Sequence, residues 1–150
     1  MADASPKLLI IDARFYDDLA DELVRGATGA LEKAGATWTR LSVPGVLEIP
    51  GALSMALEAR DNGLLDFDGV VALGCVIRGE TSHYDIVAGE SARALMDLAI
   101  GEGVAIGNGI LTVENGDQAW ARARVEEKNK GAGAAEAALA LVRIHSDLGL

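Results

Sequence analysis

Four short strand-like segments alternate with longer segments of helical periodicity, and this alternation constrains the fold more than any other feature of the chain. Residues 8–11, 70–77 and 104–111 are almost continuously apolar, which is typical of parallel strands covered on both faces. Residues 37–43 instead alternate between polar and apolar side chains, which favours a strand at the edge of the sheet. Strands that alternate with helices imply a parallel sheet with right-handed crossovers. We therefore expect an α/β fold, a three-layer α/β/α sandwich around a four-stranded parallel sheet.

The helical segments have recognisable boundaries. The first follows Asp17 or Asp18, either of which is suited to cap it, and ends at Gly35. The second has Pro50 in its first turn and ends near Arg60. The remaining three are predicted over residues 83–99, 117–127 and 132–145. We find no repeat, low-complexity segment or linker, so we expect residues 1–150 to form a single domain.

The helix expected from His83 is apolar over much of its circumference. One apolar face contains six residues, namely Val87, Ala88, Ala92, Leu95, Met96 and Ala99, and a second contains Ala94, Leu98 and Ile100. A helix with more apolar surface than a small sheet can cover indicates either a contact with another subunit or a broad core face. The sequence leaves these two alternatives open.

Composition excludes several classes of partner. The chain has 13 Lys and Arg against 23 Asp and Glu, a net charge of −10, which argues against nucleic acid or an anionic membrane as its main partner. Cys75 is the only cysteine, so we expect no disulfide and no thiolate metal cluster, and its place in a strand favours a buried structural thiol over a nucleophile. The N-terminal segment resembles no signal peptide, so we expect a cytoplasmic protein.

Candidate site residues follow the strands, since ligands of open parallel sheets bind beyond the carboxyl ends. Phe15 offers a ring on which a flat ligand could stack, although it could equally be a core plug. Glu48 could accept hydrogen bonds from a ligand or could favour a helix N-terminus. Backbone amides of residues 79–81 could bind an anion at the start of a helix. His83, in the same turn, has the side chain best suited to transfer protons near neutral pH, although it could instead cap the helix.

Two cations near the C-terminal helices could complete such a site. Arg122 and Lys130 could contact a phosphate group, or they could simply belong to a solvated face. Physical reasoning from the residues alone thus reaches a flavodoxin-like domain that binds a phosphosugar.

Longer motifs are more specific. They are PGVLEIPGAL from Pro44, GCVIRGETSHYD from Gly74, GNGILTVENGDQAWARA from Gly107 and KNKG from Lys128, together with ARF at residues 13–15. In this order and spacing the chain resembles the lumazine synthase family over essentially its whole length. The resemblance implies condensation of 5-amino-6-ribitylaminouracil with 3,4-dihydroxy-2-butanone 4-phosphate to 6,7-dimethyl-8-ribityllumazine, with release of phosphate and water and without a metal or cofactor.

The resemblance also implies roles for individual residues. Phe15 would stack on the pyrimidine ring, and His83 would be the proton-transfer residue. Val46, Leu47 and Glu48 would hold the ribityl chain and ring, while Cys75, Val76 and Ile77 would bind the ring edge through backbone groups. The phosphate would be held by Gly79, Glu80, Thr81 and Arg122, and Lys130 would lie near the site.

The family also forms homo-oligomers, with each site between adjacent subunits of a pentamer. Asn108 and Arg122 would then come from the neighbouring subunit, and Asn108 stands where many members carry Phe. Residues 124–128 are expected to be helical and charged where shell-forming members have a Gly-rich kink, so we expect a pentamer or a pair of pentamers. The alternative function is a non-catalytic relative that binds flavin or lumazine in the same pocket.

Overall fold

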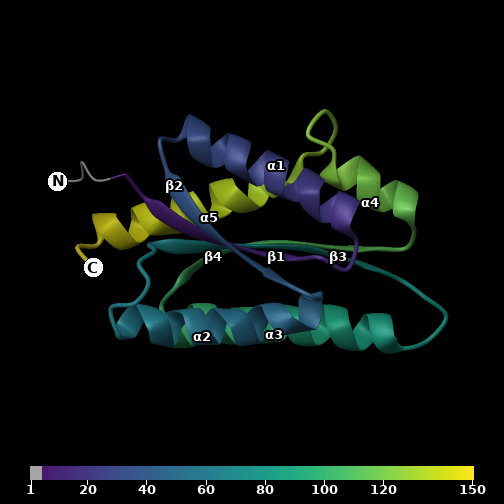
Figure 1. Cartoon of the computed structure of the whole chain (residues 1–150), viewed down its shortest axis with the longest axis horizontal. Coiled ribbons are helices and arrows are strands. Elements are labelled where there is room, and N and C mark those ends of the chain that lie inside the picture. The colour runs from purple at the N-terminus through teal and green to yellow at the C-terminus, as the bar shows by residue number, and fades with distance from the viewer. Residues whose placement is uncertain (1–4) are drawn as a thin grey trace.

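The computed structural model of the chain describes residues 5–150, and its four strands form one parallel sheet in the order β2-β1-β3-β4. The strands are β1 (Lys7–Ala13), β2 (Thr37–Val43), β3 (Gly69–Ile77) and β4 (Ala105–Val113). The helices are α1 (Asp17–Lys33), the 3₁₀ turn η1 (Val46–Glu48), α2 (Ile49–Asp61), α3 (His83–Glu102), α4 (Gly116–Ala123) and α5 (Lys130–Asp147). The predicted three-layer, flavodoxin-like α/β fold is therefore confirmed (Figure 1).

Each face of the sheet has its own apolar core. Helices α1, α4 and α5 cover one face and α2 and α3 cover the other (Figure 1). Leu8 and Ile10 of β1 point into the first core, whereas Leu9 and Ile11 point into the second. Because successive strand residues point to opposite faces, burial of both faces requires the continuous apolar runs seen in the sequence.

Strand β2 lies at the edge of the sheet, as its alternating sequence predicted. It pairs only with β1. Residues 37–42 are all exposed, since the helical layers extend little beyond β1 on this side.

Glycines in β4 allow α5 to approach the sheet closely. A Cβ atom at Gly107 would overlap the carbonyl group of Ala134, and one at Gly109 would lie 2.8 Å from the Cβ of Ala134. The close backbone approach expected from these two glycines is confirmed. This packing places the start of α5 beside α1, where Gly131 lies against the backbone of Leu23.

The expected cap of α1 is wrong. Tyr16 occupies the N-cap position and makes no side-chain capping hydrogen bond, while Asp17 and Asp18 lie within the first turn. The carboxylate of Asp17 instead accepts a hydrogen bond from Nε of Arg14 at 2.8 Å. Acidic residues in a first turn still stabilise the helix through its dipole.

The predicted end of α4 is also wrong. The helix ends at Ala123. Residues 124–128 were expected to be helical, but Arg124 is the C-cap and residues 125–128 form turns. The amide of Val125 donates to the carboxylate of Glu22 in α1 at 2.9 Å, and the amide of Asn129 donates to the carbonyl of Arg124. Contacts with α1 thus override the helical propensity of this charged segment, so the expected helical contrast with the Gly-rich kink of shell-forming members is not found.

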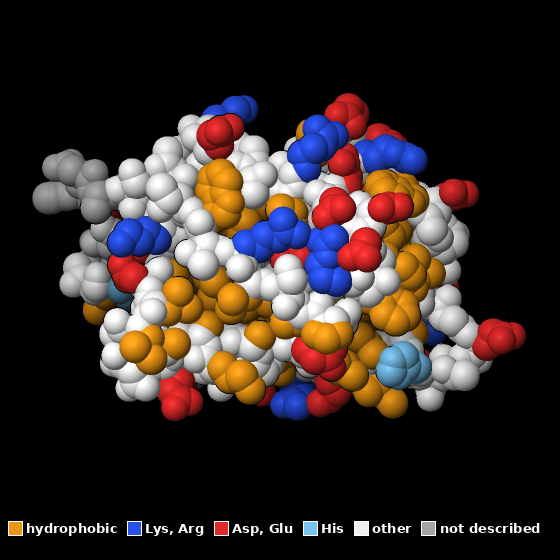
Figure 2. All heavy atoms as spheres, in the orientation of Figure 1, with side chains coloured by type: hydrophobic (Ala, Val, Ile, Leu, Met, Phe, Trp, Pro, Cys, Tyr) orange, Lys and Arg blue, Asp and Glu red, His pale blue; other side chains and the backbone are white. Residues whose placement is uncertain are grey.

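Helix α3 is longer than predicted, ending at Glu102 with Gly103 in the left-handed conformation, and its apolar surface is only partly covered. Val87 and Leu95 are buried, but Met96, placed on the same face by the sequence, is 60% exposed, and Ile100 is 76% exposed. The six residues therefore do not form one core face. Met55 of α2 is exposed as well. Figure 2 shows hydrophobic side chains gathered on the visible surface of the α2–α3 layer.

Among residues 5–150, no helix has the length and apolar character needed to cross a membrane.

Candidate active site

A hollow of about 470 Å³ lies at the carboxyl end of the sheet, between the ends of β1 and β3 and the starts of α2 and α3. This is the end at which parallel sheets bind ligands. Most of the predicted site residues line it, namely Phe15, Val46, Leu47, Glu48, Cys75, Val76, Ile77, Gly79, Thr81 and His83. Segments separated by up to 68 residues in the sequence are thus brought together in one pocket.

Two adjacent aromatic rings form one wall of the pocket. Phe15 is 73% exposed, so it is not the core plug that its sequence context allowed. Its ring meets that of Tyr16 edge-on, with centroids 4.9 Å apart and an interplanar angle of 89°. Tyr16 packs against the core, and this burial raises the pKa of its hydroxyl. The exposed face of Phe15 is available to stack on a flat ligand.

The opposite wall comes from the η1 turn. Val46 is buried against β3, where a Cβ at Gly74 would lie 2.8 Å from its Cγ2 atom. Gly74 therefore allows the turn to rest on the strand. Leu47 and Glu48 remain exposed and line the pocket, so an apolar side chain and a carboxylate face the same hollow.

The floor of the pocket is the end of β3. Cys75 is buried, and burial raises the pKa of its thiol to about 11. The predicted burial of this cysteine is confirmed. A thiol with this pKa is protonated at neutral pH, which favours a structural role over a nucleophilic one. Val76 is also buried, and Ile77 is half-buried at the mouth.

The polar turn after β3 leads to the start of α3. His83 is exposed as the first helical residue, and its backbone amide donates to Oγ1 of Thr81 at 3.3 Å. Gly79 and Thr81 line the pocket, but Glu80 does not. The turn thus places a hydroxyl and an imidazole at the N-terminal, partially positive end of a 20-residue helix.

Three predicted site residues lie away from this pocket. Asn108 is exposed in the middle of β4, and its side chain accepts a hydrogen bond from the amide of Ile110 at 2.9 Å. Arg122 lies in α4 and donates to the carbonyl of Gln118 at 3.0 Å, while Lys130 is exposed at the start of α5. None of the described residues that line the pocket is Lys or Arg.

Arg78, next to the pocket, is occupied elsewhere. Its Nε atom lies 3.1 Å from both carboxylate oxygens of Glu114, and its guanidinium lies 4.2 Å from the ring centroid of Tyr84. Its backbone amide donates to the carbonyl of Val113. Arg78 therefore ties the end of β3 to the end of β4.

Sequence reasoning missed five residues that line the pocket, namely Tyr16, Pro44, Gly45, Tyr84 and Val87. Tyr16 and Tyr84 directly follow the predicted site residues Phe15 and His83 in the sequence. This adjacency was the signal that could have indicated their place in the pocket. Within residues 5–150, no three His, Cys, Asp or Glu side chains gather in a way that could hold a metal ion.

Comparison with known proteins assigns this chain to a family. A family model described as 6,7-dimethyl-8-ribityllumazine synthase matches residues 5–146. The chain belongs to the 6,7-dimethyl-8-ribityllumazine synthase family. The lumazine synthase resemblance inferred from the motifs is thereby confirmed.

Individual relatives in this family match nearly end to end. A 6,7-dimethyl-8-ribityllumazine synthase of Agrobacterium fabrum is 60% identical over 146 residues, which cover 97% of this chain and 99% of the relative. A 6,7-dimethyl-8-ribityllumazine synthase 1 of Rhizobium meliloti is 61% identical over 142 residues, covering 95% of this chain and 93% of the relative. A 6,7-dimethyl-8-ribityllumazine synthase of Bartonella henselae is 56% identical, covering 95% of this chain and 90% of the relative.

Proposed function

We propose that this chain is a transferase of riboflavin biosynthesis that makes 6,7-dimethyl-8-ribityllumazine from 5-amino-6-ribitylaminouracil and 3,4-dihydroxy-2-butanone 4-phosphate. The observation that carries the proposal is the family match, which covers residues 5–146 and includes relatives about 60% identical. The pocket adds support, because its walls are built from the motifs by which the chain resembles that family.

The aminouracil occupies the part of the pocket nearest β1 and η1. Its ring stacks on the exposed face of Phe15 and meets backbone groups of residues 75–77 along the floor. Its ribityl hydroxyl groups donate to the carboxylate of Glu48, beside Val46 and Leu47. The hollow has a volume typical of small-molecule sites, which supports this arrangement.

The butanone phosphate lies at the start of α3. Backbone amides of residues 79–81 and the Thr81 hydroxyl hold its phosphate at the positive end of the helix. Arg122 supplies the cationic contact from a neighbouring subunit, and Asn108 and Lys130 of that subunit lie near the site. The absence of Lys and Arg from the described lining of this chain's own pocket supports a second copy.

The reaction needs proton transfers but no strong nucleophile from the protein. The pyrimidine amine attacks the ketone and loses water to give an imine, phosphate is then eliminated, and the ribityl-bearing nitrogen closes the ring with loss of a second water. Orientation of the two substrates supplies most of the acceleration. The exposed imidazole of His83 transfers protons between the reacting nitrogen and oxygen atoms.

The assembly is part of the proposal. A homo-oligomer built on a pentamer places the carboxyl end of one sheet beside the α4–α5 region of the next chain. The exposed apolar side chains Ile86, Met96 and Ile100 of α3 support burial against other copies. Residues 125–128 form turns instead of the expected helix, so this segment does not distinguish a pentamer or a pair of pentamers from a larger shell. The sedimentation coefficient must decide the size.

We further propose that residues 1–150 form a single domain and that the protein acts in the cytoplasm. The family model supports the first point because it spans almost the whole chain.

The function is tested by mixing the purified protein with both substrates and following lumazine absorbance and free phosphate. Stoichiometric formation of lumazine and phosphate, abolished when either substrate is omitted, is the expected result. Binding of lumazine without turnover would instead support the non-catalytic alternative and refute the enzyme.

A further inference from the structure

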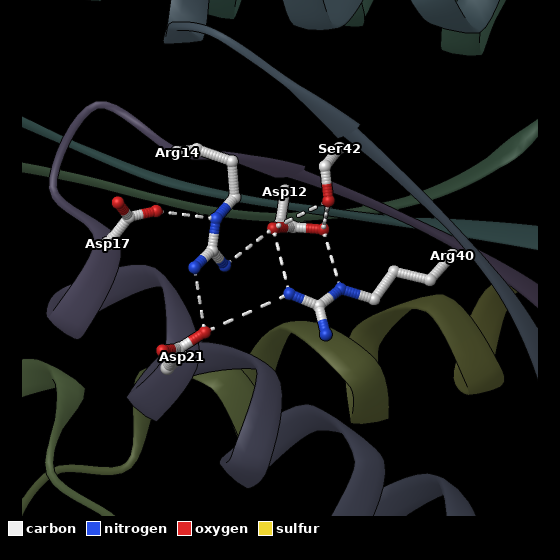
Figure 3. Close-up of polar contacts among 6 residues, drawn as sticks. All are labelled: Asp12, Arg14, Asp17, Asp21, Arg40 and Ser42. Carbon is white, nitrogen blue, oxygen red and sulfur yellow. Dashed lines mark hydrogen bonds and ion pairs between the residues drawn. The ribbon is translucent and has the colours of Figure 1, made fainter.

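Arg14 is the residue of the ARF motif that the proposed function leaves without a role, and it is at the centre of a charged cluster (Figure 3). Its three guanidinium nitrogens donate to three carboxylates, at 3.1 Å to Asp12, 2.8 Å to Asp17 and 2.9 Å to Asp21. These acids belong to the end of β1 and to the first two turns of α1. The cluster therefore spans the turn that joins the strand to the helix.

The cluster is anchored in the sheet. The carboxylate of Asp12 is fully buried and also accepts hydrogen bonds from Nε and Nη2 of Arg40 at 2.9 and 3.1 Å and from the Ser42 hydroxyl at 3.1 Å, both on β2. The backbone amide of Arg14 donates to the carbonyl of Val43 at 2.8 Å. The main chain of Arg14 is thus fixed to β2, and its side chain is fixed to Asp12 of β1 and to the start of α1.

Phe15 depends on this anchor. Its ring is 73% exposed and its one ring–ring contact among the described residues is edge-on with Tyr16, so packing does little to fix its direction. The residue before it is held by four hydrogen bonds to β1, β2 and α1. The backbone of the turn, and not the core, determines where the ring stands.

We propose that Arg14 is a positioning residue that holds the β1–α1 turn so that Phe15 presents its ring to the pyrimidine substrate. This inference rests on the proposed function, in which Phe15 stacks on that ring. Lysine cannot replace arginine here, because an ammonium group lacks the planar fork that reaches three carboxylates in different directions.

The test compares Arg14→Met, Phe15→Ala and the double variant by steady-state kinetics and by fluorescence titration with 6,7-dimethyl-8-ribityllumazine. Arg14→Met should raise the KM for the aminouracil and weaken lumazine binding about three- to tenfold, as expected when ring stacking is impaired. The KM for the butanone phosphate should not change. In the Phe15→Ala background the Arg14 substitution should have no further effect on lumazine binding, since the ring through which it acts is absent.

Two further variants separate positioning from folding. The double variant Asp17→Asn/Asp21→Asn removes the two ion pairs that join Arg14 to α1, and both acids are exposed. It leaves the ion pair between Arg14 and the buried Asp12 intact. It therefore tests the same inference if Arg14→Met does not fold. Like Arg14→Met, this double variant should weaken lumazine binding. Arg25→Met removes a comparable arginine of α1, paired with Glu22 and Glu126, and should leave both KM values unchanged.

Three outcomes would overturn the inference. If the wild type is active, unchanged lumazine affinity in the folded Arg14→Met or Asp17→Asn/Asp21→Asn variant would overturn the role of Arg14. An equal loss of affinity with and without Phe15 would show that the cluster is only structural. A wild-type protein that neither turns over nor binds lumazine would refute the proposed function and this inference with it.

Discussion

At the scale of the residue, the pocket separates side chains that can take part in chemistry from those that provide shape. His83 is exposed at the start of α3, whereas the thiol of Cys75 is buried at the end of β3 with a pKa raised to about 11. One residue can exchange protons with a ligand, and the other is held in its neutral form. We therefore expect substitution of His83 to lower kcat strongly and substitution of Cys75 to change it little.

Replacement of His83 by alanine should reduce kcat by about a hundred- to ten-thousand-fold and leave measurable turnover, because orientation and electrostatics remain. Stopped-flow absorbance of lumazine formation measures the residual rate. Complete loss of turnover in a protein with wild-type circular dichroism would show that His83 does more than transfer protons.

Replacement of Cys75 by alanine should change kcat by less than about threefold, because the proposed contacts of this residue are made by its backbone. In the wild type, iodoacetamide should alkylate the thiol slowly at neutral pH and faster as the pH approaches 11, since only the thiolate reacts. Mass spectrometry follows the modification. Rapid alkylation at pH 7, or an inactive but folded Cys75→Ala protein, would contradict this view of Cys75.

At the scale of the element, the positions of α1 and α5 depend on glycines and on one buried carboxylate. A Cβ at Gly131 of α5 would overlap the carbonyl of Leu23 in α1, while one at Gly133, two residues on, would meet no atom within 4 Å. Asp12 joins β1 to β2 and, through Arg14, to α1. Both features can be tested by stability measurements.

Gly131→Ala should lower the free energy of unfolding by about 3 kcal/mol, because the methyl group forces two helix backbones apart. Gly133→Ala is the matched control in the same helix and should raise it by up to about 1 kcal/mol, the usual gain from replacing an exposed helical glycine. Urea denaturation followed by circular dichroism measures both. Equal effects of the two substitutions would mean that α1 and α5 do not pack as closely as described.

Asp12→Asn should destabilise the protein by about 3 kcal/mol at pH 7, since it leaves two arginines without their buried partner. Burial alone would raise the pKa of Asp12, but its hydrogen bonds from Arg40 and Arg14 outweigh burial and lower it. A lowered pKa means that the stabilisation is fully present above about pH 4 and is lost as the pH falls through the folded-state pKa. The stabilities of the wild type and Asp12→Asn should therefore converge in acid.

Urea denaturation between pH 3 and pH 7 tests this pH dependence. Asp66→Asn is the control, because its carboxylate is exposed beside Lys7 and its replacement should have no measurable effect at pH 7. A constant difference between wild type and Asp12→Asn across the whole range would refute the role assigned to Asp12.

Local sequence signals predicted most of the elements but not every end. Strands β1 and β3 were evident because a strand buried on both faces has a continuous apolar sequence, and the alternating sequence of β2 indicated its edge position. The apolar run of β4 also predicted a strand, although burial alternates along it. The end of α4 was not, because Val125 departs from the helix to bond Glu22, more than 100 residues away. The Arg14 cluster was missed because it joins residues of three elements, with Arg40 of β2 lying 28 residues from Asp12 in the sequence.

At the scale of the whole molecule, one chain does not bring all the predicted site residues together in one pocket. Aromatic, carboxylate, hydroxyl and imidazole groups meet at the carboxyl end of the sheet, while Arg122, Lys130 and Asn108 lie on other surfaces of the same chain. The family resemblance predicts that all of these residues belong to one site, and in the proposed function they meet between two chains. The proposed function therefore requires that a neighbouring copy complete each pocket.

Subunit complementation tests this requirement most directly. Co-expression of the His83→Ala and Arg122→Ala variants should give mixed oligomers. In about a quarter of their sites, a pocket with intact His83 from one chain meets an intact Arg122 from its neighbour. Lumazine formation should therefore rise well above that of either variant alone. Turnover that stays at the average of the two parent variants, in oligomers shown by mass spectrometry to be mixed, would mean that each chain forms its site alone.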